Sequence, residues 1–184
     1  IKESIHIVAD GLAGEINRTQ KDTLEIGMRN ITRLSRIINN VLDFQKQNTG
    51  KIIYTPLIVN PNSLLKEAFE TMKLHANEKS LEMKWQVHET LPAIYADADL
   101  IMQVLINLLH NAIKFTEHGL ISISGETLSS DGKQVLCRFT VTDTGVGISQ
   151  VDTARLFRAF EQLDGSTTRK YGGTGLGLAI ARQL

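Results

Sequence analysis

The residues best suited to bind an anion lie near the end of the chain, where a glycine-rich turn opens an apolar helix: Gly173, Thr174, Gly175, Leu176 and Gly177. Free amide N–H groups and the macrodipole at such a helix start attract phosphate. The spacing lacks the full dinucleotide-binding pattern, the residues before it do not resemble a strand, and the P-loop pattern is absent. We therefore interpret the segment as a phosphate cradle of another kind.

A carboxylate precedes another glycine turn, which lies earlier in the chain. Asp143 follows a strand pattern that ends at Val141, and Gly145, Gly147 and Ile148 continue the turn. Glycine removes the Cβ that would block a ligand, and a buried carboxylate at this place can accept a hydrogen bond from an exocyclic amine such as that of adenine. An ordinary Asp-Thr-Gly turn is the alternative interpretation.

Two amides and a lysine interrupt an apolar helix in the middle of the chain. Asn107, Asn111 and Lys114 stand at positions i, i+4 and i+7, so their side chains project from one face. They are either part of a site or hydrogen-bonded amides of a core, and the triplet alone does not decide between the two.

Residues 149–171 lie between the two glycine turns and become polar and threonine-rich toward their end. One amphipathic piece contains Leu156, Phe157 and Phe160. Long connections in compact domains are usually functional or disordered, so we interpret the segment as a mobile lid, with a surface loop as the alternative. Arg169 and Lys170 could then reach terminal phosphates.

The elements that must position these residues alternate between helical and extended patterns. Asn60 followed by Pro61 predicts a helix start, residues 83–87 alternate as in a strand, and a helix is expected from about Asp99 to Lys114. Residues 120–128 and 135–141 predict a hairpin joined by residues 129–132. The fold class expected is α+β, a two-layer sandwich with a mixed, mostly antiparallel sheet.

An α-helical hairpin is expected to precede this sandwich. Apolar residues recur in steps of three and four from Leu24 to Val41, and a shorter pattern over residues 5–16 weakens before a second helix start near Thr19. Two such helices cannot close a core, which predicts a four-helix bundle with a second copy. Residues 47–50 end the long helix before an extended segment at 51–56, so the expected domains are 1–50 and 51–184.

Composition excludes several classes of protein. The chain of 184 residues carries 20 basic and 20 acidic side chains, so no general attraction to nucleic acid or to an anionic membrane is implied. No apolar stretch approaches the roughly 20 residues of a membrane span, and no signal-peptide pattern opens the chain. A cytoplasmic location is expected for it, possibly as part of a membrane-bound sensor.

Four segments in this order carry a resemblance to a known family: residues 107–116, 143–147, 157–160 and 173–177. They resemble the N, first glycine, F and second glycine boxes of sensor histidine kinases. Residues 30–46 are similar to the second helix of that family's dimerisation and phosphotransfer hairpin, so the resemblance extends from the first helix to Leu184. It implies the ATP-binding fold of histidine kinases, gyrase, mismatch-repair and chaperone ATPases.

The resemblance also implies roles for individual residues. Asp143 would bind the adenine amino group, Asn111 would give an oxygen to Mg²⁺, Asn107 would support that ligand shell, and Lys114 would meet phosphate. Ile113 would pack against the adenine ring. The remaining residues expected to bind ATP with it are Phe115, Gly145, Gly147, Ile148, Phe157, Arg169, Lys170, Gly173, Thr174, Gly175, Leu176 and Gly177.

The implied enzyme is an ATP-dependent protein-histidine kinase that passes its phosphoryl group to an aspartate of a response regulator and forms a homodimer through the hairpin. None of the five histidines fits the family's acceptor pattern, so the acceptor is expected before Ile1, and the family pattern continues beyond Leu184. One alternative is a gyrase- or chaperone-type ATPase, which needs a carboxylate base where Asn107 stands. Another is a nucleotide-sensing dimerisation module without transfer activity.

Overall fold

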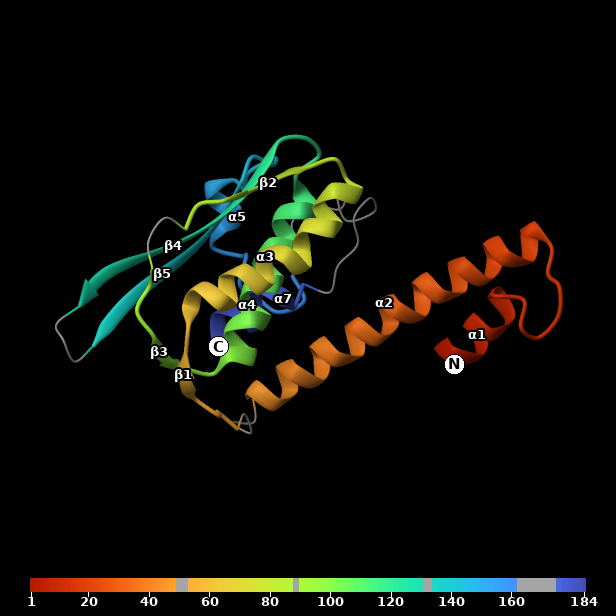
Figure 1. Ribbon diagram of the computed structural model, residues 1–184, viewed down its shortest axis with the longest axis horizontal. Coiled ribbons are helices and arrows are strands. Elements are labelled where there is room, and N and C mark those ends of the chain that lie inside the picture. The colour runs from red at the N-terminus through yellow and green to blue at the C-terminus, as the bar shows by residue number, and fades with distance from the viewer. Residues whose placement is uncertain (49–52, 88–89, 131–133, 162–174) are drawn as a thin grey trace. The chain divides into compact units, whose positions relative to one another are not determined.

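The computed structural model describes residues 1–48, 53–87, 90–130, 134–161 and 175–184 (Figure 1). The chain divides into two compact units, Ile1–Thr49 and Gly50–Leu184. Across the described residues, no helix combines the length and the apolar character needed to cross a membrane.

The first unit is the predicted helical hairpin. Helix α1 (Lys2–Ala9) packs against α2 (Arg18–Asn48), which begins one residue before the expected start. Asn17 and Gln20 form a reciprocal cap at the start of α2: the Gln20 N–H donates to Asn17 Oδ1 at 2.9 Å, and the Asn17 N–H donates to Gln20 Oε1 at 2.8 Å. These bonds satisfy donors that a helix start leaves unpaired.

The apolar seam of this unit is open to solvent. No described residue of α1 or α2 is buried, and Leu34, Ile38 and Leu42 of α2 are each at least half exposed. Their spacing of four residues places them on one face of α2. The hairpin by itself therefore buries too little apolar surface to form a core.

The second unit combines helices with two sheets (Figure 1). The larger sheet has the order β2 (Glu82–Trp85), β4 (Leu120–Ser130), β5 (Val135–Asp143), with β2 parallel and β5 antiparallel to β4. Helices α3 (Pro61–Glu78) and α4 (Ala98–Phe115) pack against each other and against this sheet. The architecture confirms the predicted α+β fold with a mixed, mostly antiparallel sheet.

The core lies between the two helices and the sheet. Asn60 caps α3 by accepting a hydrogen bond from the Asn62 N–H, and Pro61 occupies the first turn, as its fixed φ favours. The residues of this core with at most 2% of their surface exposed are Leu65, Ala68, Ala76, Leu91, Leu105, Leu109, Ile121 and Ile123.

Several strand boundaries differ from the sequence prediction, including the end of β4, which continues past Leu128 to Ser130. Residues 53–56 of the expected extended segment carry no strand, residues 51–52 lie outside the described chain, and β1 instead covers Leu57–Val59. It pairs antiparallel with β3 (Ile94–Ala96), which the sequence analysis did not predict. Strand β2 ends at Trp85, before the expected limit, and β5 continues to Asp143 because its last residue still pairs with Ile121 of β4.

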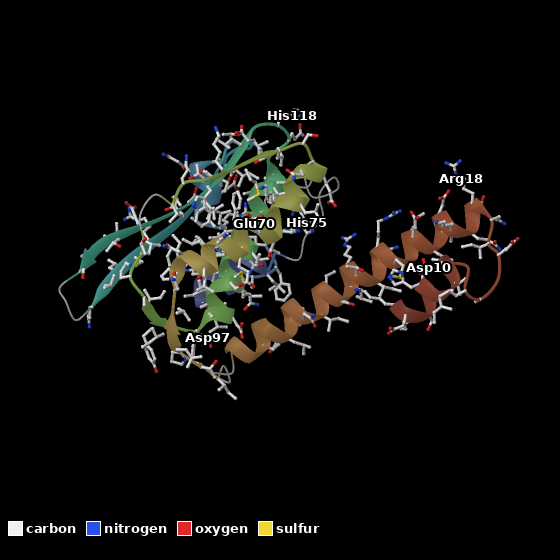
Figure 2. All side chains as sticks on the ribbon, viewed as in Figure 1. Asp10, Arg18, Glu70, His75, Asp97 and His118 are labelled. Carbon is white, nitrogen blue, oxygen red and sulfur yellow. The ribbon has the colours of Figure 1, made fainter. Side chains whose placement is uncertain are left out.

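Asp97 fixes the start of α4 to the segment before β1, and Figure 2 labels it at this helix start. Its Oδ1 accepts hydrogen bonds from the N–H groups of Asp99 and Leu100 at 3.1 and 3.2 Å. Its Oδ2 accepts from the Thr55 N–H at 2.9 Å and the Thr55 hydroxyl at 3.0 Å. The bonds from the N–H groups of Thr55 and Leu100 are the main causes that lower the pKa of Asp97.

The lowered pKa of Asp97 predicts a pH-dependent contribution to stability. Because the folded pKa lies below the ordinary value, the stabilisation is complete above about pH 4 and is lost as the pH falls through the folded pKa. Asp97→Asn should therefore lower the urea midpoint at pH 7, and the difference from the parent chain should shrink at lower pH. Fluorescence of Trp85, the single tryptophan, would report this unfolding. A pH-independent difference would contradict the role of the carboxylate charge.

Candidate functional site

Helix α4 brings the predicted amides to the second glycine segment. The Asn107 side-chain amide Nδ2 donates to the carbonyl oxygen of Gly177, the first residue of α7 (Gly177–Gln183), at 3.4 Å. A Cβ added to Gly177 would lie 3.5 Å from Asn107 Oδ1. One of the three predicted polar residues of α4 thus contacts the helix that follows the phosphate-cradle sequence.

The first glycine turn lies against the C-terminal end of α4. A Cβ on Gly145 would lie 2.6 Å from the carbonyl oxygen of Phe115, and the Val146 N–H donates to that oxygen at 3.4 Å. The Asp143 carboxylate holds the turn, because its Oδ1 accepts the Gly145 N–H at 2.8 Å. The side chain of Asp143 is exposed, which corrects the expectation of a buried carboxylate.

Both glycine segments therefore contact one helix. Their contact points, Asn107 and Phe115, are eight residues apart, or about 12 Å along the helix axis. Asn111 lies one turn after Asn107 on the same helix face and is half-buried. The three predicted groups of residues thus lie along the C-terminal half of α4, with the carboxylate turn at its end and Asn107 with Gly177 about two turns earlier.

The last turn of α4 carries two further predicted residues. Lys114 Nζ lies 4.5 Å from the centre of the Phe115 ring, and 37% of Phe115 remains exposed. Lys79, from the end of α3, donates to the carbonyl oxygens of Ile113 and Lys114 at 2.8 and 3.3 Å. A cation at a helix C-terminus is favourable, so Lys79 stabilises the turn that carries Lys114. No local sequence pattern indicates this role of Lys79, because its partners lie more than thirty positions away.

Part of the segment between the glycine turns is described. Helix α5 (Gln150–Thr153) begins it, and Phe157 lies under the guanidinium of Arg182 at 5.4 Å from the ring centre. The Phe160 N–H donates to the Gly175 carbonyl oxygen at 3.1 Å. The F-box residues therefore contact the second glycine segment and α7.

Not every predicted residue can be placed. Arg169, Lys170, Gly173 and Thr174 lie outside the described residues, as do residues 162–171 of the predicted lid. Gly147 and Ile148 are exposed. Leu176 is fully buried, so its side chain belongs to the packing of α7 rather than to a surface that a ligand could touch.

The histidines form no shared site in the described part of the chain. His6, His75, His110 and His118 are all exposed, and Figure 2 labels His75 on α3 and His118 after α4. His88 lies outside the described residues. Within those residues no three His, Cys, Asp or Glu side chains gather as metal ligands.

Comparison with known proteins gives matches over both units. The family described as histidine kinase-, DNA gyrase B-, and HSP90-like ATPase matches residues 96–184. The signal transduction histidine-protein kinase BarA of Escherichia coli K12 is 38% identical over 174 residues, which are 94% of this chain and 19% of BarA. The chain thus spans about a fifth of the length of this curated relative.

Two solved structures share the fold. The crystal structure of full-length ShkA in complex with AMPPNP has a TM-score of 0.77 and 30% identity, covering 99% of this chain and 40% of ShkA. The histidine kinase ThkA in complex with the response regulator protein TrrA has a TM-score of 0.67 at 23% identity, covering 99% of this chain and 50% of that chain. The second likeness supports the fold alone.

Proposed function

We propose that this chain is the ATP-binding part of a sensor histidine kinase, because residues 96–184 match the histidine kinase-, DNA gyrase B-, and HSP90-like ATPase family and its curated relatives include histidine kinases. In the intact protein it would transfer the γ-phosphoryl group of ATP to a histidine, and the group would then pass to a response-regulator aspartate. The observation that carries the proposal is α4 with one glycine segment against each end of its polar face.

The adenine end of the proposed site is Asp143. Its Oδ1 is held by the Gly145 N–H, and Oδ2 has no partner among the described residues, so an exocyclic amine can donate to it. Phe115 lies beside the turn and is partly exposed, and Ile113 precedes it on α4. The Phe115 side chain would offer apolar surface to the ring, as Ile148 would from the turn, whereas Ile113 is buried in the core.

The phosphate end of the proposed site is formed by α4 and the second glycine segment. Asn111 offers an amide oxygen of the kind that Mg²⁺ accepts, and the lack of a carboxylate cluster among the described residues suits an ion that keeps several waters and binds phosphate oxygens. Bound Mg²⁺ would neutralise charge on the phosphates. Lys114 would add a positive charge, Asn107 would orient the segment at Gly177, and Arg169, Lys170, Gly173 and Thr174 would contribute from the chain before it.

The proposed assembly is a homodimer formed by the hairpin. A second copy would cover Leu34, Ile38 and Leu42, which solvent reaches in a single unit. The resemblance to sensor kinases also makes a response-regulator receiver domain the proposed protein partner and the cytoplasm the proposed location. The balanced charge of the chain gives no reason to propose nucleic acid as a partner.

An ATP-hydrolysing enzyme of the gyrase or chaperone kind is the second candidate function. Such an enzyme needs a carboxylate to accept the proton of the attacking water. Asn107 stands at that position, and an amide cannot act as the base that accepts this proton. Its Nδ2 instead donates a hydrogen bond to the Gly177 carbonyl oxygen. The curated relatives also favour the kinase. Slow hydrolysis is therefore expected.

Calorimetric titration of the 184-residue chain with AMPPNP tests the proposal. We expect saturable binding at one site per chain in the presence of Mg²⁺, and weaker binding when EDTA removes the ion, because the phosphates then repel one another and lose a bridging partner. With γ-labelled ATP, no acid-labile phosphate should form on this chain, because none of its histidines fits the acceptor pattern. Absence of AMPPNP binding would refute the proposed function.

A further inference from the structure

Four charged side chains form a cluster between the two glycine segments: Asp152, Arg155, Arg158 and Glu161, here called the ion-pair cluster. Arg155 Nε lies 2.6 Å from Glu161 Oε1, and Arg155 Nη1 lies 3.6 Å from Asp152 Oδ1. Arg158 Nε lies 3.7 Å from Glu161 Oε2. Only 23% of Glu161 and 27% of Asp152 are exposed, so solvent screens these pairs less than ordinary surface pairs.

One end of the cluster is tied to the first glycine turn. Asp152 Oδ2 accepts the Ser149 hydroxyl at 2.6 Å, and the Asp152 N–H donates to Ser149 Oγ at 3.1 Å. Ser149 follows Ile148, which ends the glycine turn that begins at Asp143. Asp152 therefore links Arg155 to the residue directly after that turn.

The other end is packed against the second glycine segment. The Phe160 N–H donates to the Gly175 carbonyl oxygen, and a Cβ on Gly175 would lie 2.7 Å from the backbone oxygen of Glu161. Phe160 has φ of 64°, a conformation that persists in a non-glycine residue only where its surroundings impose it. Gly175 in turn leads through buried Leu176 to Gly177, which Asn107 contacts.

A continuous series of contacts thus joins the two glycine segments outside α4. It runs from Ser149 through Asp152, Arg155 and Glu161 to Gly175. We propose that Arg155 and Glu161 are positioning residues that hold the second glycine segment in place and so set the affinity for the phosphate chain of the nucleotide. This inference rests on the proposed function, and neither residue is required to touch the ligand.

The inference predicts a selective loss of affinity for the triphosphate. In the 184-residue chain, Glu161→Gln and Arg155→Gln should each raise the Kd for Mg-AMPPNP about fivefold, because each variant loses two partly screened ion pairs. The Kd for adenosine should stay unchanged, because the contacts of Asp143 with Gly145 do not involve the cluster. The exchanged pair R155E/E161R should not recover the affinity, because the new carboxylate would face Asp152 and the new guanidinium would face Arg158.

A matched control separates this role from that of an ordinary ion pair. Arg138 and Glu126 form an Arg–Glu pair at 3.3 Å on β5 and β4, with both side chains more than half exposed. Arg138→Gln should change neither Kd. Amide hydrogen exchange of residues 175–184 without nucleotide gives a second readout, and exchange should be faster in Glu161→Gln than in the parent chain.

Two results would overturn the inference: an unchanged Kd for Mg-AMPPNP in both variants, or equal losses for adenosine and Mg-AMPPNP together with a lower thermal midpoint, which would indicate general destabilisation. If the parent chain binds no AMPPNP, the proposed function fails separately. The exchange rates then decide the positioning role, and unchanged protection of residues 175–184 in Glu161→Gln would reject it.

Discussion

Asp143→Ala is expected to weaken ATP binding by about ten- to a hundredfold, since a hydrogen bond to a charged group contributes about 1.5 to 3 kcal/mol. Asp143 is the last residue of β5, and its Oδ1 accepts a hydrogen bond from the Gly145 N–H. This bond fixes the orientation of the carboxylate and therefore the position of Oδ2. Alanine removes both bonds, whereas asparagine retains the shape and loses the charge. Asp143→Asn should therefore give an intermediate affinity.

Calorimetric titration with Mg-AMPPNP measures this change. Glu126→Gln is a suitable control because it removes a carboxylate on the exposed part of β4, in an ion pair with Arg138. Its affinity should equal that of the parent chain. Equal affinity of the Asp143→Ala variant would remove adenine recognition from this residue and would leave α4 as the only supported part of the site.

Gly145→Ala should lower the free energy of unfolding of unit 2 by about 1 to 3 kcal/mol, the usual cost of forcing an extra methyl group into a packed place. The new Cβ would lie 2.6 Å from the Phe115 carbonyl oxygen and 2.8 Å from Asp143 Oδ1, and the first of these is a backbone atom at the end of α4. The turn must then move away from the helix. Urea unfolding followed by the fluorescence of Trp85 measures the loss.

The sign of this change is the decisive part of the result. Where a site has room, replacing glycine by alanine stabilises a protein by about 0.4 to 1 kcal/mol. A neutral or stabilising Gly145→Ala would therefore show that the turn does not press on α4. Gly147→Ala is the control in the same turn, because its Cβ has open space and only its φ of 69° opposes alanine, at a cost of about 1 kcal/mol.

Local signals allowed much of the fold to be predicted. The Asn60 and Pro61 start of α3 and the hairpin of β4 and β5 depend on residues close in sequence, and the structure confirms both. Strand β1 was misplaced because three residues of a short ribbon are specified by their pairing with β3, which comes more than thirty residues later. No local pattern encodes such a partner.

The sequence indicated which segments form the candidate site but not how these segments contact one another. The sequence analysis grouped Asn107, Asp143 and Gly177 by chemistry and by resemblance, but the contact between Asn107 and Gly177 spans seventy residues. The roles of Lys79 and Glu161 were not predicted, because a lysine after a helix and a glutamate after a phenylalanine are common in any sequence. Only the folded backbone gives them their partners.

Helix α4 runs without interruption from Asn107 to Phe115. The number of residues between them therefore fixes the relative orientation of its two contact points. Each residue of an α-helix turns the chain by about 100°, so inserting one alanine after Asn111 would rotate Phe115 to a different side of the axis from Asn107. A one-residue insertion or deletion between those positions should therefore displace one of the two glycine segments, whereas a substitution there leaves the spacing of the two contacts unchanged.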